Sequence, residues 1–385
     1  MTIPTTNQIE RYRAAMATMA GRDTPLIYNE WYCAGFGPEF SRTLLKRKLL
    51  GKDIVFYRTS EGEVVALDDR CAHRSFPLSA GKLVNDEIVC AYHGFCYDRR
   101  GDCVKVPSQE RAPKVGVRHY PLREIGRVVW IWMGDPALAE TRNPPVQPWM
   151  TDPAWESSTG YLHLPANYVG LHENLLDLSH IEYLHAETLG LNSPGFAAFP
   201  FELLVAEGQI AIRRRVEPTG LPPVFADTTG LGGIKTAGRA SRTDYVSPAL
   251  EQLSASYYDG ALPEGEREEF MVRTAHLMTP ETLTTTHYFI DHAWNWGHGS
   301  VELRRLMHEG LFAAFVEDVK GLTLVEETLA SREGDPEFFE ISVAADGAAV
   351  AMRRHLFKRA AEERAATQQQ ASAPVAAPVR IVRAI

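Results

Sequence analysis

Two short loops, each with one cysteine and one histidine, constrain this chain more than any other feature. The first loop is Cys71-x-His73 and the second is Cys90-x-x-His93, with sixteen residues between His73 and Cys90. Two thiolates and two imidazoles on two loops are typical of a metal site. A structural zinc site is one interpretation, but zinc loops usually pair cysteine with cysteine and histidine with histidine. The mixed pairing favours a two-iron cluster in which both cysteines bind one iron and both histidines bind the other.

The residues around these loops resemble the Rieske motif of aromatic-ring hydroxylating oxygenases. The chain reads CAHRSFPLSAG and CAYHGFCYDRRGDC, similar to the family patterns CxHRxxPLSxG and CxYHGWxFDxxGxC. Phe95 replaces the tryptophan that is usual in the family. Phe76 and Tyr92 stand where respiratory Rieske proteins have the cysteines of a disulfide, so that bridge is absent. The resemblance implies a [2Fe-2S] cluster bound by Cys71, His73, Cys90 and His93.

The composition excludes several classes of protein. The chain of 385 residues is 45% hydrophobic and 23% charged, which is ordinary for a soluble globular protein of two domains. The net charge of −9 argues against a nucleic-acid partner. We find neither an apolar run that could span a membrane nor a secretory signal, so a cytoplasmic location is expected. The remaining cysteines, Cys33, Cys96 and Cys103, are then expected to be reduced thiols.

A second metal site is predicted from the histidines that follow the cluster domain. A Rieske cluster moves one electron at a time, so the rest of the chain should hold the electron's destination. Asn174, Asp177 and His180 are spaced by three and would share one face of a predicted helix over 172–185. His185 would lie about 140° around that helix from His180. For both histidines to reach one metal, the helix must end, bulge or unwind between them.

The third ligand is predicted from a stripe along a long helix near the C-terminus. The stripe positions are Leu311, Phe315, Asp318, Leu322, Val325 and Leu329. A carboxylate on a buried apolar stripe is costly unless it is paired or bound to a metal. A buried salt bridge of Asp318, for instance with Arg305, is the simpler alternative, and Glu317 is expected to be solvated. With His180 and His185, however, Asp318 completes the facial triad of a mononuclear Fe(II) oxygenase.

The resemblance extends to this second site. ENLLDLSHIEYLH is similar to the catalytic-iron motif NxxDxxHxxxxH of Rieske oxygenase α subunits, and FVEDVK is similar to their acidic ligand segment. The resemblance implies a mononuclear iron bound by His180, His185 and Asp318. It also implies that Asn174 supports this site. Asp177 would bridge the two metal sites by accepting a hydrogen bond from a cluster histidine of a neighbouring subunit.

The resemblance further implies a fold, an assembly and an electron donor. The fold class is α+β, with an N-terminal all-β Rieske domain and a C-terminal catalytic domain that has an antiparallel sheet and helices of the helix-grip type. In the family each cluster lies near the iron of the next chain, which implies a head-to-tail homotrimer. The chain has no Gly-rich dinucleotide fingerprint, so a partner reductase should bind NAD(P)H and pass on electrons, in some systems through a ferredoxin.

The chain most resembles the α-only components of the vanillate and dicamba O-demethylases. This resemblance implies that O₂ and reductase electrons hydroxylate a small substituted aromatic, with O- or N-dealkylation. Aromatic-ring or angular dioxygenation, which gives a cis-diol or cleaves a diaryl ether, is the nearest alternative. An electron-transfer protein without oxygenase activity is an alternative of another class. His276 is a candidate substrate contact, because its strand resembles a pocket strand of the demethylases. Tyr257 is a weaker candidate. Both read equally well as core residues.

Changes of pattern along the chain predict its division into segments. The first residues are rich in helix formers, and short strands begin near Trp31. DIVFYR and EVVALDD flank a turn and predict a hairpin, while VVWIWM predicts a strand buried on both faces. The predicted segments are a helical extension (1–29), the Rieske domain (30–140), a Pro-rich linker (141–154), the catalytic mononuclear iron domain (155–365) and an extended or mobile C-terminal tail (366–385).

Overall fold

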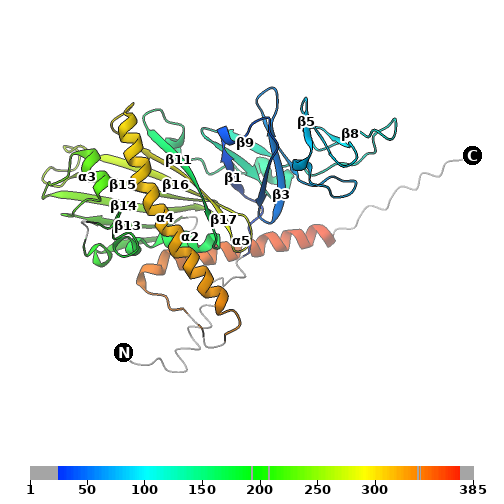
Figure 1. Ribbon diagram of the computed structural model, residues 1–385. Coiled ribbons are helices and arrows are strands. Elements are labelled where there is room, and N and C mark those ends of the chain that lie inside the picture. The colour runs from blue at the N-terminus through cyan, green and yellow to red at the C-terminus, as the bar shows by residue number, and fades with distance from the viewer. Residues whose placement is uncertain (1–24, 192–193, 207–208, 336–337, 339, 373–385) are drawn as a thin grey trace, which may run out of the picture.

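The computed structural model describes residues 25–191, 194–206, 209–335, 338 and 340–372, and contains two β-rich parts that pack side by side (Figure 1). The N-terminal part holds three small antiparallel sheets, and the C-terminal part holds one seven-stranded sheet with helices. This architecture confirms the predicted fold class, an all-β domain followed by an α+β domain. Among the described helices, none has the combination of length and apolarity that crossing a bilayer requires.

The N-terminal part carries the two Cys/His loops on small sheets. Its strands are β1 (Trp31–Phe36), β2 (Leu45–Leu49), β3 (Lys52–Arg58), β4 (Val64–Asp68), β5 (Lys82–Val84), β6 (Glu87–Val89), β7 (Cys96–Tyr97), β8 (Cys103–Lys105), β9 (Leu122–Ile125) and β10 (Val128–Trp132). They form sheets of order β1-β10-β9, β2-β3-β4 and β5-β6-β7-β8. The predicted hairpin is confirmed, because β3 and β4 pair antiparallel. β10 is buried throughout, as predicted, since Trp130 and Trp132 join one core and Val129 and Ile131 join another.

The C-terminal part is built on one long sheet. Its strands are β11 (Glu156–Leu164), β12 (Phe201–Ala206), β13 (Gln209–Val216), β14 (Ala237–Ser247), β15 (Leu250–Asp259), β16 (Phe270–Pro280) and β17 (Thr286–Trp294), in the order β11-β17-β16-β15-β14-β13-β12. All neighbouring strands are antiparallel. The α-helices are α2 (Tyr168–Leu176), α3 (Pro223–Thr229), α4 (Val301–Ser331) and α5 (Gly347–Ser372).

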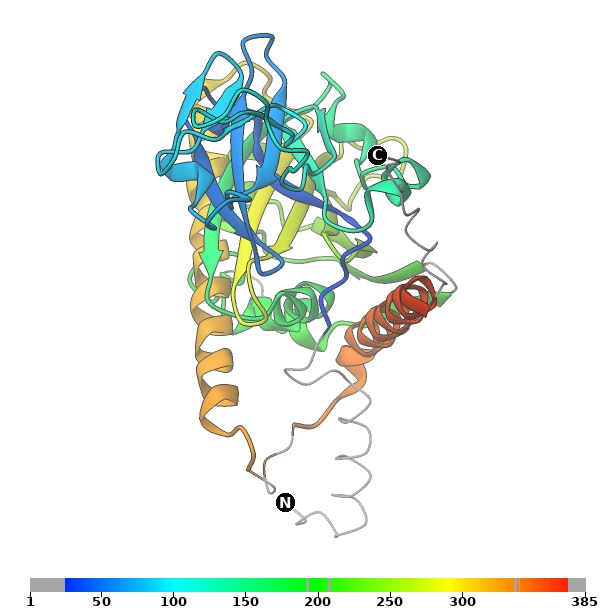
Figure 2. The same cartoon turned by 90° about the vertical axis from the view of Figure 1, so that its right-hand side faces the viewer.

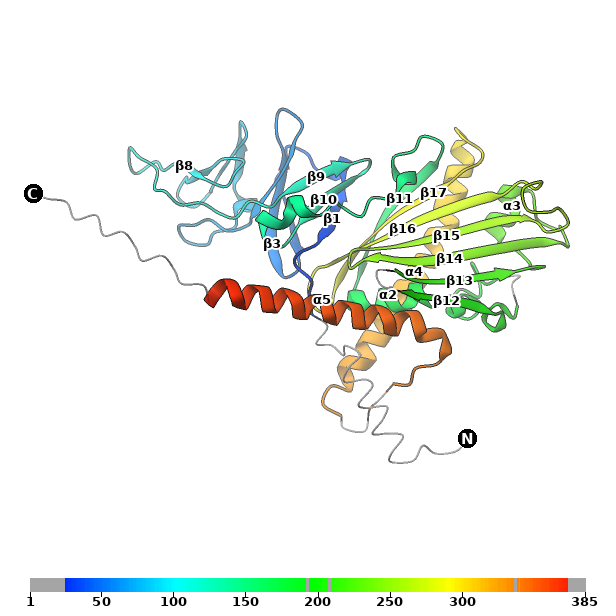
Figure 3. The ribbon, with the colours of Figure 1, turned by 180° about the vertical axis from the view of Figure 1, so that it is seen from behind.

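The helices cover one face of this sheet and one of its edges. α4 crosses the sheet and contacts β11, while α2 packs on β14, β15 and β16 (Figures 1 and 2). Figure 3 shows the opposite face, with α4 behind the strands. α5 runs past β12 and β13 and contacts α2. Short 3₁₀ helices connect these elements, namely η1 (Gly37–Glu39), η2 (Leu78–Ala80), η3 (Pro136–Thr141), η4 (Pro148–Met150), η5 (Leu178–Glu182), η6 (Phe196–Ala198) and η7 (Ala344–Asp346).

The long sheet separates two cores, because successive side chains of a strand point to opposite faces. On β16, Ala275 and Leu277 belong to the core shared with Trp130 of the N-terminal part. His276, between them, points to the helix-covered face, where its ring lies 5.5 Å from that of Phe315 in α4. One face of β16 and β17 therefore binds the N-terminal part, and the other contributes to a space beneath the helices.

Helix α2 is shorter than the predicted helix over 172–185. It ends at Leu176, and Asp177 is extended, with φ of −128° and ψ of 97°. The side chain of Asp177 then caps the short helix η5, which gives the chain a reason to leave the α-helix at this point. Asn174, Asp177 and His180 consequently do not share the face of one helix, and that prediction is wrong.

The predicted extended tail is wrong over residues 366–372, which belong to α5. This helix buries Met352, Leu356 and Ala360, which recur every four residues and so form one stripe. Glu363 adds two hydrogen bonds from the backbone N–H groups that precede β1, at 2.8 and 2.9 Å. Residues 366–368 are themselves exposed, so the helix is anchored by the packed stripe that precedes the Ala- and Gln-rich sequence.

Two further predictions concern residues outside those that the structure describes. Most of the predicted N-terminal helical extension falls on residues 1–24, and the end of the predicted tail falls on residues 373–385.

Strands β14 and β15, at the centre of the sheet, come from the structure alone and had no counterpart among the sequence predictions.

Candidate functional site

The two Cys/His loops have the same backbone geometry. In each loop the cysteine N–H donates to the carbonyl of the residue five positions later, at 2.8 Å in both cases. The cysteine carbonyl also accepts from the N–H four positions later. Cys71 and Cys90 are thereby held at the buried base of the loops, whereas His73 and His93 are exposed at their tips. Two equivalent loops of this kind place two sulfurs inside and two imidazoles outside.

Aromatic side chains fix the loop tips. The rings of His73 and His93 lie 4.6 Å apart, and the ring of Phe95 stacks on His73 at 4.7 Å. Tyr97 lies beneath, where its hydroxyl accepts from the Ala72 N–H at 2.9 Å and lies 3.2 Å from the Cys71 sulfur. Hydrogen bonds to the sulfurs are one of the terms that set the potential of an iron–sulfur cluster.

This donor set fits a [2Fe-2S] cluster better than a structural zinc ion. Burial raises the pKa of the Cys90 thiol, and the neighbouring Cys71 sulfur raises it further. Such a pair needs a strong cation to persist as thiolates. The separation of a buried sulfur side from an exposed nitrogen side matches one iron bound by cysteine and one by histidine.

His180, His185 and Asp318 come together beneath the sheet. One ligand atom of each residue lies within 4.8 Å of the others. Asp318 Oδ1 is 3.2 Å from His185 Nε2 and 3.6 Å from His180 Nε2. The end of α2 and the turns after η5 supply the break that the spacing of five between the two histidines requires. Three donors in this arrangement leave one side of a bound metal open.

Hydrogen bonds hold both imidazoles with Nε2 toward the centre. His180 Nδ1 donates to the Asp177 carbonyl at 2.6 Å, and His185 Nδ1 donates to Glu317 Oε2 at 2.7 Å. Such partners of the second ring nitrogen fix the tautomer and orientation of a metal-binding histidine. The prediction that Glu317 is solvated is therefore wrong, because Glu317 bonds His185 and also accepts from Thr188 Oγ1 at 2.7 Å.

Asp318 is an ionised carboxylate in a buried position. Burial acts to raise its pKa, but His185, His180 and Asn174 together outweigh burial, and the pKa lies below its ordinary value. Asn174 Nδ2 also donates to Asp318 Oδ1, at 2.8 Å, as expected for a residue that supports the site. No arginine or lysine among the described residues pairs with Asp318, so the alternative of a buried salt bridge to Arg305 is not what the structure has. Arg305 instead pairs with exposed Glu302 and Glu309.

Asp177 lies between the iron-site candidates and the molecular surface. Its carboxylate accepts from the Ser179 N–H and hydroxyl, both at 2.9 Å, and it is partly exposed. Strands β5 and β8, which flank the cluster loops, lie at the end of the molecule opposite to α3 and the far end of the sheet (Figure 1). Within one chain, Asp177 therefore contacts the predicted iron ligand His180 but neither of the cluster histidines His73 and His93.

A cavity opens next to the three candidate ligands. Its walls are mainly apolar, with Leu175 from α2, Val272 from β16 and Leu311 and Phe315 from α4. The cavity has a volume of about 50 Å³, so it is narrow and favours a small ligand. An apolar space with a few polar groups beside it is typical of a site for a small organic molecule.

Both predicted substrate contacts line this cavity. His276 Nδ1 shares a hydrogen bond of 2.5 Å with the Tyr288 hydroxyl, and burial lowers its pKa to about 4. Tyr257 stacks on Phe225 with ring centres 4.1 Å apart. His276 is therefore neutral near pH 7, and Tyr257 offers a flat aromatic wall.

Three polar residues of the cavity had no counterpart among the sequence predictions. Arg239 comes from β14, Thr274 from β16 and His292 from β17, and all three are buried. Thr274 Oγ1 and His292 Nδ1 share a hydrogen bond of 2.7 Å. The only sequence signal was an arginine at an inward position of an alternating strand, and it becomes visible once β14 is recognised as a strand.

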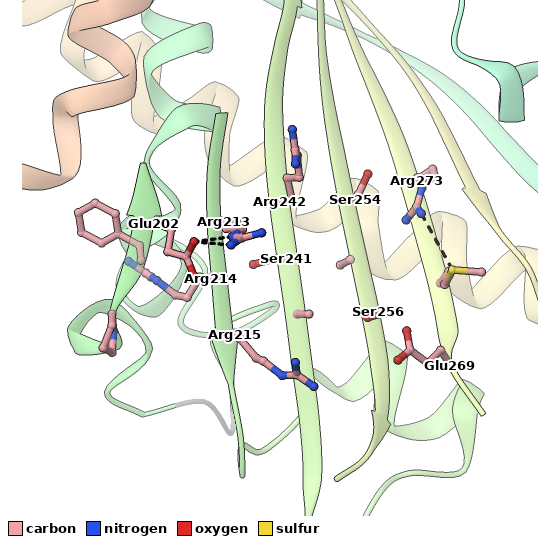
Figure 4. Close-up of a pocket in the computed structure, with 15 residues that line it drawn as sticks. Glu202, Arg213, Arg214, Arg215, Ser241, Arg242, Ser254, Ser256, Glu269 and Arg273 are labelled. Atoms are coloured by element: carbon pink, nitrogen blue, oxygen red, sulfur yellow. Dashed lines mark hydrogen bonds and ion pairs between the residues drawn. The ribbon is translucent and has the colours of Figure 1, made fainter. Parts of the chain in front are cut away.

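A second hollow lies on the opposite face of the sheet and contains no predicted site residue (Figure 4). It is rich in arginine, but most of these charges are compensated. Arg213 pairs with Glu202 at 2.5 Å, Arg242 with Asp244, and Arg215 with Glu217 and Glu264. The hollow therefore reads as a solvated sheet face with paired charges.

Comparisons with known proteins agree with this geometry. Residues 30–121 match the Rieske [2Fe-2S] domain family, and residues 164–362 match the vanillate O-demethylase oxygenase C-terminal domain family. The chain is 35% identical over 331 residues to a putative toluene-4-sulfonate monooxygenase system iron-sulfur subunit of Comamonas testosteroni, covering 83% of this chain and 93% of that protein. It is 33% identical over 342 residues to the oxygenase component of dicamba O-demethylase from Stenotrophomonas maltophilia, covering 86% and 97% of the two chains.

Solved structures give the same result. The crystal structure of dicamba monooxygenase bound to 3,6-dichlorosalicylic acid matches with a TM-score of 0.82 at 29% identity, covering 88% of this chain and 99% of that one. Another structure of that enzyme contains non-haem iron and dicamba, and it matches with a TM-score of 0.71 at 28% identity, covering 89% and 99%.

Proposed function

The chain belongs to the Rieske oxygenases whose C-terminal domain is of the vanillate O-demethylase type, and we propose that it removes an O- or N-alkyl group from a small substituted aromatic. It is the oxygenase component of a Rieske non-haem iron monooxygenase, with a [2Fe-2S] cluster and a mononuclear iron. The observation that carries the proposal is the convergence of His180, His185 and Asp318 at the wall of a narrow apolar cavity.

We propose the following ligand sets for the two metal centres. Their support is the geometry described above and the match of the surrounding residues to the two families. The cluster ligands are Cys71, His73, Cys90 and His93, and the iron ligands are His180, His185 and Asp318. When bound, the cluster supplies electrons singly and the iron activates O₂.

The protein's own residues then position and protect the reaction. The hydrogen bonds of His180 to the Asp177 carbonyl and of His185 to Glu317 keep both imidazoles aimed at one point. The apolar walls exclude water, and the stacked pair of Phe225 and Tyr257 offers a flat surface to an aromatic ring.

The proposed substrate class rests on the names of relatives. The related oxygenase components are named for O-demethylation of dicamba and of vanillate, and one is named a chloroacetanilide N-alkylformylase. Loss of an O- or N-bound carbon group is common to these names. Hydroxylation of the carbon next to oxygen or nitrogen achieves this loss, because the resulting hemiacetal or hemiaminal collapses to a phenol or amine and an aldehyde.

We further propose a head-to-tail homotrimer in the cytoplasm, fed by an NAD(P)H-dependent reductase with or without a ferredoxin. The names of two toluene-4-sulfonate relatives refer to a monooxygenase system, and other relatives are called oxygenase components, which supports a separate electron donor. The trimer is supported by the position of Asp177, which contacts the iron-site candidates within the chain but not the cluster loops. In a ring of chains, Asp177 of one subunit would face a cluster histidine of the next.

Two measurements test the proposed function. Iron and acid-labile sulfide on anaerobically purified protein should amount to about three irons and two sulfides per chain. We expect aryl methyl ethers and N-alkyl anilides to be turned over under ¹⁸O₂ with a reductase. Each dealkylated product should be accompanied by one aldehyde, and that aldehyde should carry the single labelled oxygen atom when it forms. Two labelled atoms in one organic product would instead establish the dioxygenase alternative. Zinc without sulfide would contradict the cluster assignment.

A further inference from the structure

The cavity contains a buried guanidinium that forms no ion pair with any residue that the structure describes. Arg239 lies on β14 and is 4% exposed. Its Nε and Nη1 atoms are buried and donate to no residue that the structure describes. Its contacts are with aromatic faces, at 4.9 Å from the ring centre of Phe196 and 5.9 Å from that of Tyr257. A buried cation with two unpartnered nitrogens is costly, so its retention calls for a ligand that accepts hydrogen bonds from them.

A second buried arginine lies near Arg239, and the carboxylate of Asp177 attracts this second arginine without forming an ion pair with it. Arg214, on the adjacent strand β13, is 5% exposed and places its guanidinium 4.8 Å from the same Phe196 ring. Arg214 Nη1 donates to the Phe196 carbonyl at 3.1 Å, but its Nε has no partner among the described residues. Two guanidiniums thus flank one ring, and no carboxylate among the described residues forms an ion pair with either of them.

The arginine on the other face of β14 does have a carboxylate partner, so on this strand the lack of an ion pair is particular to Arg239. Arg242 lies three residues further on and points to the hollow of Figure 4. Its Nε and Nη2 bind both carboxylate oxygens of Asp244, at 2.7 and 2.5 Å. The exposed arginine is therefore neutralised within the chain, whereas the buried arginine of the cavity is not.

We propose that Arg239 binds an anionic substituent of the substrate, so that the enzyme selects aromatic acids over neutral aromatics. A carboxylate or a sulfonate presents two oxygens that match the fork of a guanidinium. Arg239 lines the same cavity as His180, His185 and Asp318, so a ligand in this cavity has both the guanidinium and the candidate iron ligands among its walls. This assignment rests on the proposed function for the identity of the site, and it adds the charge class of the substrate.

The test compares three ligands of nearly equal shape on the purified holoenzyme by isothermal titration calorimetry. The probes are 4-methoxybenzoate, 4-methoxybenzenesulfonate and the neutral 4-methoxybenzamide, with inorganic sulfate as a fourth ligand. Wild type should bind at least one aromatic anion about 10- to 100-fold more tightly than the amide, the ratio expected for a charge-assisted pair. The anion that binds more tightly identifies the carboxylate or the sulfonate as the natural group.

Variants assign this preference to one side chain. Arg239→Gln should bring the anions to within about 3-fold of the amide, with amide affinity unchanged, while Arg239→Lys should keep part of the preference. Arg242→Gln is the matched control on the same strand and should behave as wild type. Without ligand, Arg239→Gln should melt no lower than wild type, because it removes an unsatisfied buried charge. Unlike wild type, it should gain no thermal stability from the aromatic anions.

The outcomes separate this assignment from the proposed function. Three results would overturn the assignment. Wild type could bind the amide as tightly as the aromatic anions, Arg239→Gln could keep the preference for the anions, or inorganic sulfate could bind wild type as tightly as the aromatic anions. If the amide is demethylated and the acids are neither bound nor turned over, the proposed function stands and the role of Arg239 falls. If the acids bind through Arg239 but no probe is oxygenated with a reductase, the anion site stands and dealkylation falls.

Discussion

His185 Nδ1 donates a hydrogen bond of 2.7 Å to Oε2 of Glu317, the residue that directly precedes Asp318 in α4. Adjacent residues of one helix thus reach the same imidazole from two sides. Glu317 orients the ring through Nδ1, and Asp318 lies 3.2 Å from Nε2. A carboxylate behind a metal-binding histidine fixes its tautomer and raises its basicity.

Replacement of Glu317 should loosen the iron site without abolishing it. We expect Glu317→Gln to weaken Fe(II) binding by about 10- to 100-fold, the usual effect of losing such an outer partner. Titration of the apo-mononuclear site with Fe(II) measures this change. Glu309→Gln, on the exposed side of the same helix, is the control. An unchanged Fe(II) affinity in Glu317→Gln would show that the hydrogen bond does not orient His185 in the holoenzyme.

Removal of Asp318 should empty one metal site and leave the other intact. We expect Asp318→Ala to contain about two irons and two sulfides per chain in place of about three and two, because a facial triad requires its carboxylate. Metal analysis and the electron paramagnetic resonance signal of the reduced cluster measure the two sites separately. Retention of the third iron with full turnover would remove Asp318 from the ligand set.

Asp177→Asn should separate metal binding from electron transfer. The amide oxygen can still cap η5 through Ser179, so both metal sites should fill. Turnover should fall to a few per cent or less, because the amide does not replace the carboxylate toward a cluster histidine of the next subunit. Stopped-flow oxidation of the reduced cluster by O₂ in the presence of substrate follows this step directly. Full activity of the variant would eliminate the bridge.

The buried pair of His172 and Glu251 should make stability depend on pH. Burial lowers the pKa of His172 to about 4 and raises that of Glu251 well above its ordinary value. His172 Nε2 donates to the Pro248 carbonyl, so its Nδ1 accepts from the protonated Glu251 at 2.7 Å. The pair is therefore neutral on both sides in the folded chain.

The sign of the effect follows from proton linkage. Because the folded pKa of Glu251 is raised, its contribution is full below the unfolded pKa and is lost as pH rises toward the folded one. Glu251→Gln keeps the hydrogen bond and removes the titration. His172 is present in both proteins, so its own titration cancels in the comparison. Between pH 6.5 and 8.5, wild type should lose up to about 1.4 kcal/mol per pH unit relative to this variant. If the melting temperatures of the two proteins instead depend on pH in the same way, Glu251 is ionised in the folded protein and the prediction is wrong.

Two glycines offer a matched test of packing. Gly160 of β11 faces α4, where an added methyl group would overlap the ring of Phe312, whereas the nearest atom to such a group at Gly170 of α2 is Leu322 Cδ2 at 3.8 Å. We expect Gly160→Ala to destabilise the protein by about 1–3 kcal/mol through overpacking. Gly170→Ala should stabilise it by about 0.5–1 kcal/mol through helix propensity. Chemical denaturation measures both, and effects of the same sign would contradict the packing of α4 on β11.

Short-range patterns in the sequence predicted the site better than they predicted the fold around it. The spacing of the two Cys/His loops, and the single acid on an apolar helical stripe, depend on local geometry, and the structure brings these residues together. Their roles as ligands stay predictions. Glu317 was misjudged because a stripe describes one helix in isolation, and the histidine that bonds Glu317 comes from a different segment.

The features that were missed depend on tertiary contacts. α5 was missed because its Ala- and Gln-rich composition resembles that of a tail, although Met352 and Leu356 recur with helical spacing. Arg239 could not be singled out, because its inward position is visible only once β14 is recognised as a strand. The surfaces that bury these side chains lie far away in the sequence, on β12 and β13 for α5 and beneath the helices for Arg239.

The two faces of β16 and β17 also limit how these enzymes can be recombined. Ala275, Leu277 and Phe289 belong to one core with Trp130 and Trp132 of the N-terminal part, and both Ala275 and Leu277 lie directly beside His276, which lines the cavity. A chimera that takes its cluster domain from one relative and its C-terminal domain from another would create a mismatched interface on these same strands. A functional exchange must carry the outward residues of β16 and β17 with the cluster domain, and on β16 these residues alternate with Thr274 and His276, which line the cavity.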